Sequence, residues 1–413
     1  MATIKPFKAV RPAREYAEQV VSLPYDVMNR AEAEVMAKGN PKSFLRISRS
    51  EIDLPNQQDD YAMEVYEKAK ENLNEFISNG TLIRDDKPGL YIYRLTKEGR
   101  AQTGVVACVS IDEYENDTIK KHELTRVEKE IDRINHFDVC SAHTEPVFLT
   151  YREDKRISTI IEGFVSKNEA EYDFTLADGV THTFWCISDE NIVNSICELF
   201  KEVPNLYIAD GHHRSASAYK VGVKRREQFP NYSGNEEYNF FVAVSFPDSE
   251  LKIYDYNRVV KDLNGNSTEE FIEKVKKAGF EVRELGKEIF VPPKKHTFGM
   301  FLEEKWYELV IPDSEVPSDA VESLDVSILQ NKLLAPILGI DDPRTNKRIE
   351  FIGGIRGLSE LERRVKSDMK VAFAIYPVII DDLLKTSDEN KIMPPKSTWF
   401  EPKLGSGLFV HEF

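Results

Sequence analysis

Apolar and polar positions alternate along this chain with two different periods, which predicts a mixture of helices and strands. From Tyr61 to Ile77 the apolar residues recur at helical spacing and stop at Asn79-Gly80, so we expect an amphipathic helix with a glycine end signal. Residues 91–96 and 104–111 follow a strand pattern on either side of a polar turn. The pattern further predicts strands over 147–151, 206–209, 240–246, 251–256 and 371–376, a hairpin over 298–311, and helices over 192–203, 214–228, 269–278 and 326–338. Together these segments predict a mixed α and β fold of the α+β class.

Two charged stretches add detail to this pattern. Ser359 with Glu362 three residues later is a capping-box signature and predicts the start of a helix. The charged run 122–133 forms either a functional face or only a solvated helix, and both interpretations stay open. If this run is helical, three of its residues share one face through their spacing of three and four, namely Thr125, Lys129 and Asp132.

The chain is long enough to form two folded regions. Its 413 residues with 41% hydrophobic content can bury a substantial core. We expect an N-terminal region over 1–259 and a C-terminal α+β lobe over 260–413. The last stretch, from residue 392 onward, keeps Trp399 and Phe409 among its prolines and glycines, so we expect it to pack back onto the body.

The charge balance restricts the class of partner. Lys and Arg total 55 against 71 Asp and Glu, a formal charge of −16, which argues against broad attraction to nucleic acid or an anionic membrane. No apolar run is long enough to cross a bilayer, and the first residues lack the apolar core of a secretion signal, so we expect a cytoplasmic protein. The four scattered cysteines favour small buried hydrophobes over a zinc or redox motif. The oligomeric state stays open.

The segment 206–216 carries the densest chemistry in the sequence. A short apolar strand ends there, Gly211 permits a tight turn, and a helix-forming stretch follows. Free backbone amides at a helix start favour an anion such as a phosphoryl group. The alternative is an aspartate that caps a helix with surface histidines behind it. The polar residues gathered in this turn are Asp210, His212, His213 and Arg214.

Three other segments hold carboxylates or groups that bind phosphate. Asp26 lies in a turn fixed by proline, Glu123 in the charged run, and Glu145 directly before a strand. The stretch 393–407 either lines a phosphate site or forms a structural clasp through its aromatic residues, and the two are compatible. Its candidate phosphate ligands are Lys396, Ser397, Thr398 and Lys403.

Four motifs, spread over nearly the whole chain, together match one known family. They are Pro24-Tyr25-Asp26-Val27; His122-Glu123 with Thr125, Lys129, Asp132 and Arg133; Ala209 through Arg214; and Met393 through Leu408. This set resembles the bacterial and archaeal domain-of-unknown-function family one thousand and fifteen. The segment Asp210-Gly211-His212-His213-Arg214 is also similar to the signature of the free serine kinase in the ParB/sulfiredoxin-like superfamily.

The second resemblance implies a ParB/sulfiredoxin-like core and a phosphotransferase that uses a nucleotide (ADP or ATP), serine or phosphoserine and, in the kinase version, Mg²⁺. Asp26, Glu123 and Glu145 are then the candidate bases for the hydroxyl proton. The alternatives are a phosphoserine phosphatase-type hydrolase with the same pocket and a non-enzymatic module that senses nucleotide. The implied catalytic residues are Asp210, His212, His213, Arg214, Glu123 and Asp26, and the implied cofactor-binding residues are Gly211, Ser215, Lys396, Ser397, Thr398 and Lys403.

Overall fold

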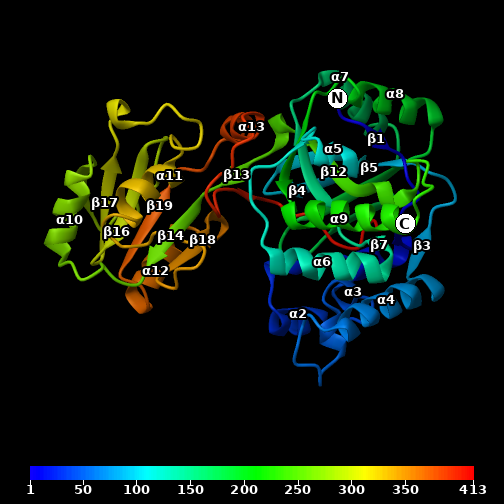
Figure 1. Ribbon diagram of the computed structural model, residues 1–413, viewed down its shortest axis with the longest axis horizontal. Coiled ribbons are helices and arrows are strands. Elements are labelled where there is room, and N and C mark those ends of the chain that lie inside the picture. The colour runs from blue at the N-terminus through cyan, green and yellow to red at the C-terminus, as the bar shows by residue number, and fades with distance from the viewer. The chain divides into compact units, whose positions relative to one another are not determined.

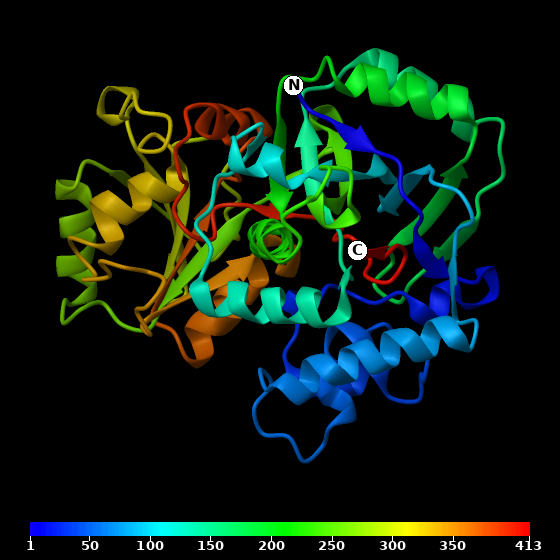
Figure 2. The ribbon, with the colours of Figure 1, turned by 45° about the vertical axis from the view of Figure 1, so that its right-hand side comes forward.

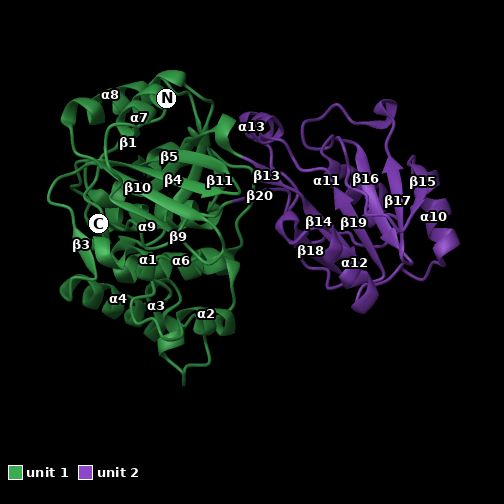
Figure 3. Ribbon diagram, turned by 180° about the vertical axis from the view of Figure 1, so that it is seen from behind, with its two compact units in different colours: residues 1–251, 402–413 green, residues 252–401 purple.

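The computed structural model describes residues 1–413, which form two units (Figure 1). Unit 1 contains residues 1–251 and 402–413, and unit 2 contains residues 252–401 (Figure 3). The expected division between residues 259 and 260 falls inside strand β14 (Tyr256–Val260), which pairs with strands of unit 2 alone. The segment 402–413 returns to unit 1, and the expectation that the C-terminal stretch packs back onto the body is confirmed for these residues.

Unit 1 is built on a nine-stranded mixed sheet with the order β6-β11-β8-β12-β5-β4-β10-β9, and β1 also pairs with β5. Only β6/β11 and β8/β12 are parallel neighbours. The strands are β1 (Ile4–Lys5), β4 (Leu90–Lys97), β5 (Arg100–Ser110), β6 (Ile119–Lys120), β8 (Val147–Tyr151), β9 (Tyr172–Thr175), β10 (Thr181–Ile187), β11 (Leu206–Asp210) and β12 (Phe240–Pro247). Two short ribbons accompany the sheet: β2 (Val10–Pro12) with β3 (Leu82–Arg84), and β7 (Ala142–His143) with β21 (His411–Glu412).

The helices of unit 1 cover this sheet and extend beyond it. Figure 2 looks nearly along α9, with α6 beside it, and these two helices pack against each other. Helix α4 in turn packs against α6, and α7 packs against α8. The helices are α1 (Ala17–Val20), α2 (Arg30–Ala37), α3 (Leu45–Ser48), α4 (Met63–Ser78), α5 (Ile111–Glu115), α6 (Val127–Cys140), α7 (Lys155–Val165), α8 (Glu190–Phe200) and α9 (His212–Gln228), with 3-10 turns η1 (Arg14–Tyr16), η2 (Tyr25–Val27), η3 (Ser50–Asp53), η4 (Glu237–Asn239) and η5 (Asp248–Glu250).

The period of two along the strands explains the core of unit 1. On β5, Val105, Ala107 and Val109 point into one apolar cluster together with residues of α6 to α9. On β4, Tyr91 points to the opposite face, where its ring stacks on that of Phe184 at 5.4 Å. Both faces of the sheet are therefore buried, which holds the end of β11 rigidly in place.

Unit 2 is a six-stranded antiparallel sheet with the order β15-β17-β16-β19-β14-β18. Its further strands are β13 (Ile253–Tyr254), β15 (Glu281–Gly286), β16 (Thr297–Leu302), β17 (Lys305–Val310), β18 (Ile349–Gly353), β19 (Val371–Ile375) and β20 (Trp399–Phe400). Strands β13 and β20, near the two ends of this unit, pair with each other. Its helices are α10 (Thr268–Lys277), α11 (Asp325–Leu329), α12 (Leu358–Ser367) and α13 (Ile380–Asp388), with short turns η6 (Asp313–Glu315), η7 (Gln330–Leu334) and η8 (Gly354–Arg356).

The α+β class is confirmed, while three local predictions are wrong. Helix α12 is capped by Gly357 without a side-chain hydrogen bond, so Ser359 and Glu362 form no capping box. The charged run becomes helical only from Val127, which leaves Thr125 outside the face expected for it. The helix expected over 326–338 changes to a π-helical turn after Leu329. None of the helices has the length and apolar content that crossing a membrane requires.

Candidate functional site

The turn between β11 and α9 is set by one glycine. Gly211 has a φ of 98°, a left-handed conformation that glycine adopts without steric cost. A Cβ at this position would also lie 3.1 Å from Nε of Arg214. Gly211 caps α9 with no side-chain hydrogen bond, and its own N–H donates to the Asp210 carboxylate at 2.8 Å. The start of α9 therefore presents backbone amides beside a packed guanidinium, as the sequence predicted.

Arg214 is the centre of the site. Its side chain is 3% exposed, and Nη2 lies 3.9 Å from Asp26 and 3.8 Å from Asp210. Its Nη1 donates to the carbonyl of Pro146, whereas Nε is buried with no hydrogen-bond partner. Burial alone would lower the pKa of Arg214, but the neighbouring carboxylates more than offset it and raise that pKa. The Arg214 guanidinium is thus permanently charged, and its Nε donor has no hydrogen-bond partner within the protein.

Lys403 reaches the same corner from the C-terminal segment. Its Nζ lies 3.0 Å from Oδ2 of Asp210. Burial would raise the pKa of Asp210, but Lys403 and Arg214 hold it well below its usual range. The Asp210 carboxylate is therefore ionised at neutral pH and orients both cations.

The candidate bases lie in different environments. Asp26, in η2, keeps 39% of its side chain exposed beside Arg214. Glu145 is fully buried, and its Oε1 accepts hydrogen bonds from the Tyr25 N–H at 3.2 Å and the Ser406 hydroxyl at 2.9 Å. Burial raises the pKa of Glu145. Glu123 is half-buried in the segment before α6. Of these three carboxylates, Asp26 combines exposure with a short distance to Arg214.

The two adjacent histidines hold a neighbouring segment. His212 accepts a hydrogen bond at Nε2 from the His122 N–H at 3.4 Å, and His213 accepts one at Nε2 from the Arg126 N–H at 3.0 Å. The rings of His122 and His212 also pack edge to face at 4.5 Å. Burial lowers the pKa of both His212 and His213. Both imidazoles are therefore neutral at pH 7 and fix the 122–126 segment against α9.

The remaining predicted ligands fall into two groups. Ser215 is fully buried, and its hydroxyl donates to the Gly211 carbonyl at 3.2 Å, so it supports the turn. Lys396, Ser397 and Thr398 belong to unit 2. There the Ser397 hydroxyl donates to the Pro394 carbonyl at 2.6 Å, and the Lys396 amine lies 5.6 Å from the Tyr256 ring. Their participation in a phosphate site stays a prediction.

Arg133 and Tyr25 are site residues to which sequence reasoning gave no role. Arg133 is 4% exposed, pairs with Asp132, and places its guanidinium 3.9 Å from the centre of the Tyr25 ring. The sequence did contain a pattern that indicates burial of Arg133. This residue shares the helical spacing of the buried His136 and Phe137 and so lies on the face that packs inward. A charge at such a position requires a polar partner in the interior.

The donors at this corner suit a phosphate group. A buried unpaired Nε, a lysine amine and the amides of a helix start are the groups that bind phosphate oxygens. No three His, Cys, Asp or Glu side chains gather as a metal ion held by protein ligands alone requires. Mg²⁺ is commonly held by one or two carboxylates together with substrate phosphates, and Asp26 and Asp210 flank Arg214.

The chain is similar to a family of proteins and, distantly, to several solved structures. Free serine kinase in complex with AMP is 14% identical over 71% of this chain and 86% of that chain, with a TM-score of 0.35. A conserved hypothetical protein from Pyrococcus furiosus is 15% identical over 74% and 94%, with a TM-score of 0.36. SbnI from Staphylococcus aureus, with a C-terminal truncation, is 10% identical over 74% and 86%, with a TM-score of 0.40. No curated protein matches the sequence. The model of the family described as "Protein of unknown function (DUF1015)" matches residues 4–327, and the chain therefore belongs to the DUF1015 family.

Proposed function

We propose that this protein is a small-molecule phosphotransferase that moves a phosphoryl group between a nucleotide, ADP or ATP, and serine. The observation that carries the proposal is the environment of Arg214, a buried guanidinium with an unpaired Nε at the start of α9. Phosphoryl transfer depends on positioned positive donors more than on covalent chemistry. The likeness of residues 210–214 to the free serine kinase motif supports the same reaction and supplies serine as the acceptor.

Each side chain then has a defined task. Arg214 and Lys403 neutralise the phosphoryl oxygens, and the amides at the start of α9 orient them. Asp26 is the base, because its carboxylate is accessible beside Arg214, whereas Glu145 is enclosed. Glu145 is a positioning residue that holds the Tyr25 backbone and thereby the turn containing Asp26.

The proposed step is an in-line displacement. The serine hydroxyl oxygen forms a bond to the terminal phosphorus of the nucleotide, and the bond from that phosphorus to the bridging oxygen breaks. The hydroxyl proton passes to Asp26, and the nucleotide leaves with one phosphate fewer. A bound Mg²⁺ would supply further positive charge to the phosphates.

Asp26→Asn tests the assignment, because asparagine keeps the size of the side chain and cannot accept the proton. We expect kcat for phosphoserine formation to fall by about 10²- to 10⁴-fold, with little change in KM for the nucleotide. The assay follows transfer to serine from ATP and from ADP, with Glu128→Gln, at an exposed carboxylate of α6, as the control that keeps its rate. An Asp26→Asn enzyme with full activity would contradict the role of Asp26. Release of phosphate from phosphoserine without any nucleotide would instead establish the hydrolase.

A further inference from the structure

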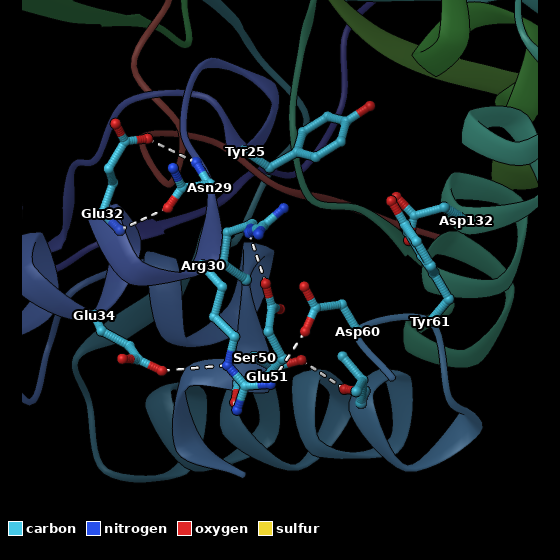
Figure 4. Close-up of polar contacts among 12 residues, drawn as sticks. Tyr25, Asn29, Arg30, Glu32, Glu34, Ser50, Glu51, Asp60, Tyr61 and Asp132 are labelled. Atoms are coloured by element: carbon cyan, nitrogen blue, oxygen red, sulfur yellow. Dashed lines mark hydrogen bonds and ion pairs between the residues drawn. The ribbon is translucent and has the colours of Figure 1, made fainter. Parts of the chain in front are cut away.

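A second polar cluster lies in unit 1, and we name it the α6 cleft. Figure 4 shows Glu51, Asp60, Tyr61 and Asp132 around it. We propose that the α6 cleft binds the ammonium and carboxylate groups of an α-amino acid, and that this amino acid is the phosphoryl acceptor. This assignment of the acceptor rests on the proposed function. The cleft is lined by Ser48, Arg49, Ser50, Glu51, Asp60, Tyr61, Val65, Tyr66, Asp132, Arg133 and His136.

One wall of the α6 cleft offers donors to a carboxylate. Arg133 uses Nε and Nη2 on Asp132, while its Nη1 is buried with no hydrogen-bond partner. The Ser48 hydroxyl is also buried without a partner. Leaving buried donors unpaired destabilises the protein, so a ligand that accepts hydrogen bonds from them gains affinity. The planar guanidinium of Arg133 matches the geometry of a carboxylate.

The other wall offers carboxylates to an ammonium group. Glu51 is 3% exposed and lies 2.7 Å from Nε of Arg49, but this contact lacks hydrogen-bond geometry and leaves Oε1 without a hydrogen bond. Asp60 is held by Arg30 at 3.1 Å, and Nη2 of the same guanidinium donates to the Glu51 backbone carbonyl at 3.0 Å (Figure 4). Arg30 therefore fixes the Asp60 carboxylate and the backbone at Glu51 in place before a ligand arrives.

The α6 cleft adjoins the phosphoryl site through a single aromatic ring. The Arg133 guanidinium lies 3.9 Å from the centre of the Tyr25 ring. The next residue, Asp26, lies 3.9 Å from Arg214. An amino acid held by Arg133 would thus lie near the turn that carries the proposed base.

The cleft opens by movement of its cover. Its volume of about 10 Å³ holds about one water molecule, so an amino acid enters only when a wall shifts. Tyr61 is half exposed, and its hydroxyl accepts one hydrogen bond, at 2.7 Å, from the exposed amine of Lys129 on α6. The exposed Tyr61 side chain is the part of the wall that the proposal requires to move, because a surface contact of this kind is weak. This gives Lys129, singled out in the sequence, a role outside the phosphate site.

The proposal predicts a strict requirement for both charges. Titration calorimetry of the full chain with L-serine is expected to show binding. Ethanolamine, which lacks the carboxylate, and 3-hydroxypropionate, which lacks the ammonium group, are expected to bind at least 100-fold more weakly, because each leaves a buried charge unpaired. Equal affinity for all three compounds, or no binding of any amino acid including O-phosphoserine, would overturn the assignment.

Glu51→Gln separates this proposal from the proposed function. It keeps the shape of the side chain and removes the charge that faces the ammonium group, so KM for serine should rise at least tenfold while KM for the nucleotide stays within twofold. Glu34→Gln, which changes an exposed partner of the same Arg30, is the matched control and should alter neither constant. A second outcome is that the native chain binds serine and loses this binding in Glu51→Gln, while no phosphotransfer is detected. That result would support the α6 cleft and refute the proposed reaction. Phosphotransfer with unchanged KM for serine in Glu51→Gln would refute the cleft alone.

Discussion

Arg214 of unit 1 and Arg258 of unit 2 are both buried, but the groups that surround their guanidinium groups differ in kind. Arg214 faces two carboxylates at 3.8 and 3.9 Å and keeps Nε unpaired. Arg258 donates to the carbonyl oxygens of Tyr256 and Lys396, and its guanidinium lies 5.1 Å from the Phe351 ring. Burial lowers the pKa of Arg258 to about 10, whereas carboxylates raise that of Arg214.

The comparison separates a structural arginine from one for which we propose a function. Both are equally removed from water, so burial by itself does not mark a site. Arg258 gives its donors to backbone carbonyls and holds the turn around Lys396 against β14. Arg214 keeps a donor for a group that the protein itself does not supply. The number of unused donors therefore distinguishes the two roles better than burial does.

The largest effect is expected from replacing each arginine by lysine. Arg214→Lys should reduce phosphotransfer by about 10³-fold, because the ammonium group cannot reproduce the directed guanidinium donors. Arg258→Lys should leave the rate within twofold and lower the free energy of unfolding by roughly 1–3 kcal/mol, since one buried carbonyl loses its donor. Steady-state kinetics and urea unfolding measure both quantities. A loss of activity in Arg258→Lys as large as that in Arg214→Lys would erase the distinction.

Acid should affect the two units with opposite signs. Burial lowers the pKa of His122 to about 4 and that of His136 to about 3, both in unit 1. The unfolded chain takes up these protons near pH 6.5, so unit 1 loses on the order of 1 kcal/mol per pH unit for each histidine as the pH falls from 6.5 to 4. In unit 2, burial raises the pKa of Asp325 from 3.8 to about 7. Folded unit 2 then holds a proton that the unfolded chain releases, so it gains stability as the pH falls from 7 to 4.

Hydrogen exchange measured by mass spectrometry at pH 7, 6 and 5 resolves the two units within one chain. After correction for the intrinsic rate, protection in unit 1 should fall and protection in unit 2 should rise. Asp325→Asn should remove the gain in unit 2, because asparagine still accepts a hydrogen bond from the His296 N–H but does not titrate. Parallel losses in both units would contradict the assignment of the titrating groups.

A smaller effect is expected from the two lysines of the C-terminal motif. Lys403→Met should raise KM for the nucleotide about tenfold, because it removes one charge-assisted contact and releases Asp210. Lys396→Met should have a lesser effect, since its amine lies over the Tyr256 ring. Equal losses in the two variants would show that both lysines bind phosphate.

Local periodicity was sufficient to predict most elements of the fold. Strand β8 has the bounds expected for it, and α4 begins within two residues of the expected start, because burial on one face imposes the spacing directly. Ser359 failed as a cap because Gly357, with its left-handed φ, already turns the chain into α12. The capping-box pattern considers Ser359 and Glu362 alone and so does not include the glycine two residues earlier.

The candidate site was predictable where its chemistry is concentrated in sequence. Asp210 and Arg214 lie in one turn, so their spacing alone indicated an anion site, and the turn has the expected form. The contacts that bury His212 and His213 come from the distant 122–126 segment, and no local pattern indicated them. The Tyr25–Arg133 contact joins residues 108 positions apart and has no local signature.

Lys403 and Ser406 reach Asp210 and Glu145 from a segment that the ribosome makes only after the whole of unit 2. A nascent chain that has released residues 1–251 therefore carries these carboxylates without two of their stabilising contacts. The pocket that we propose for a phosphorylated ligand is therefore complete only after residues 402–413 have been made and have returned to unit 1.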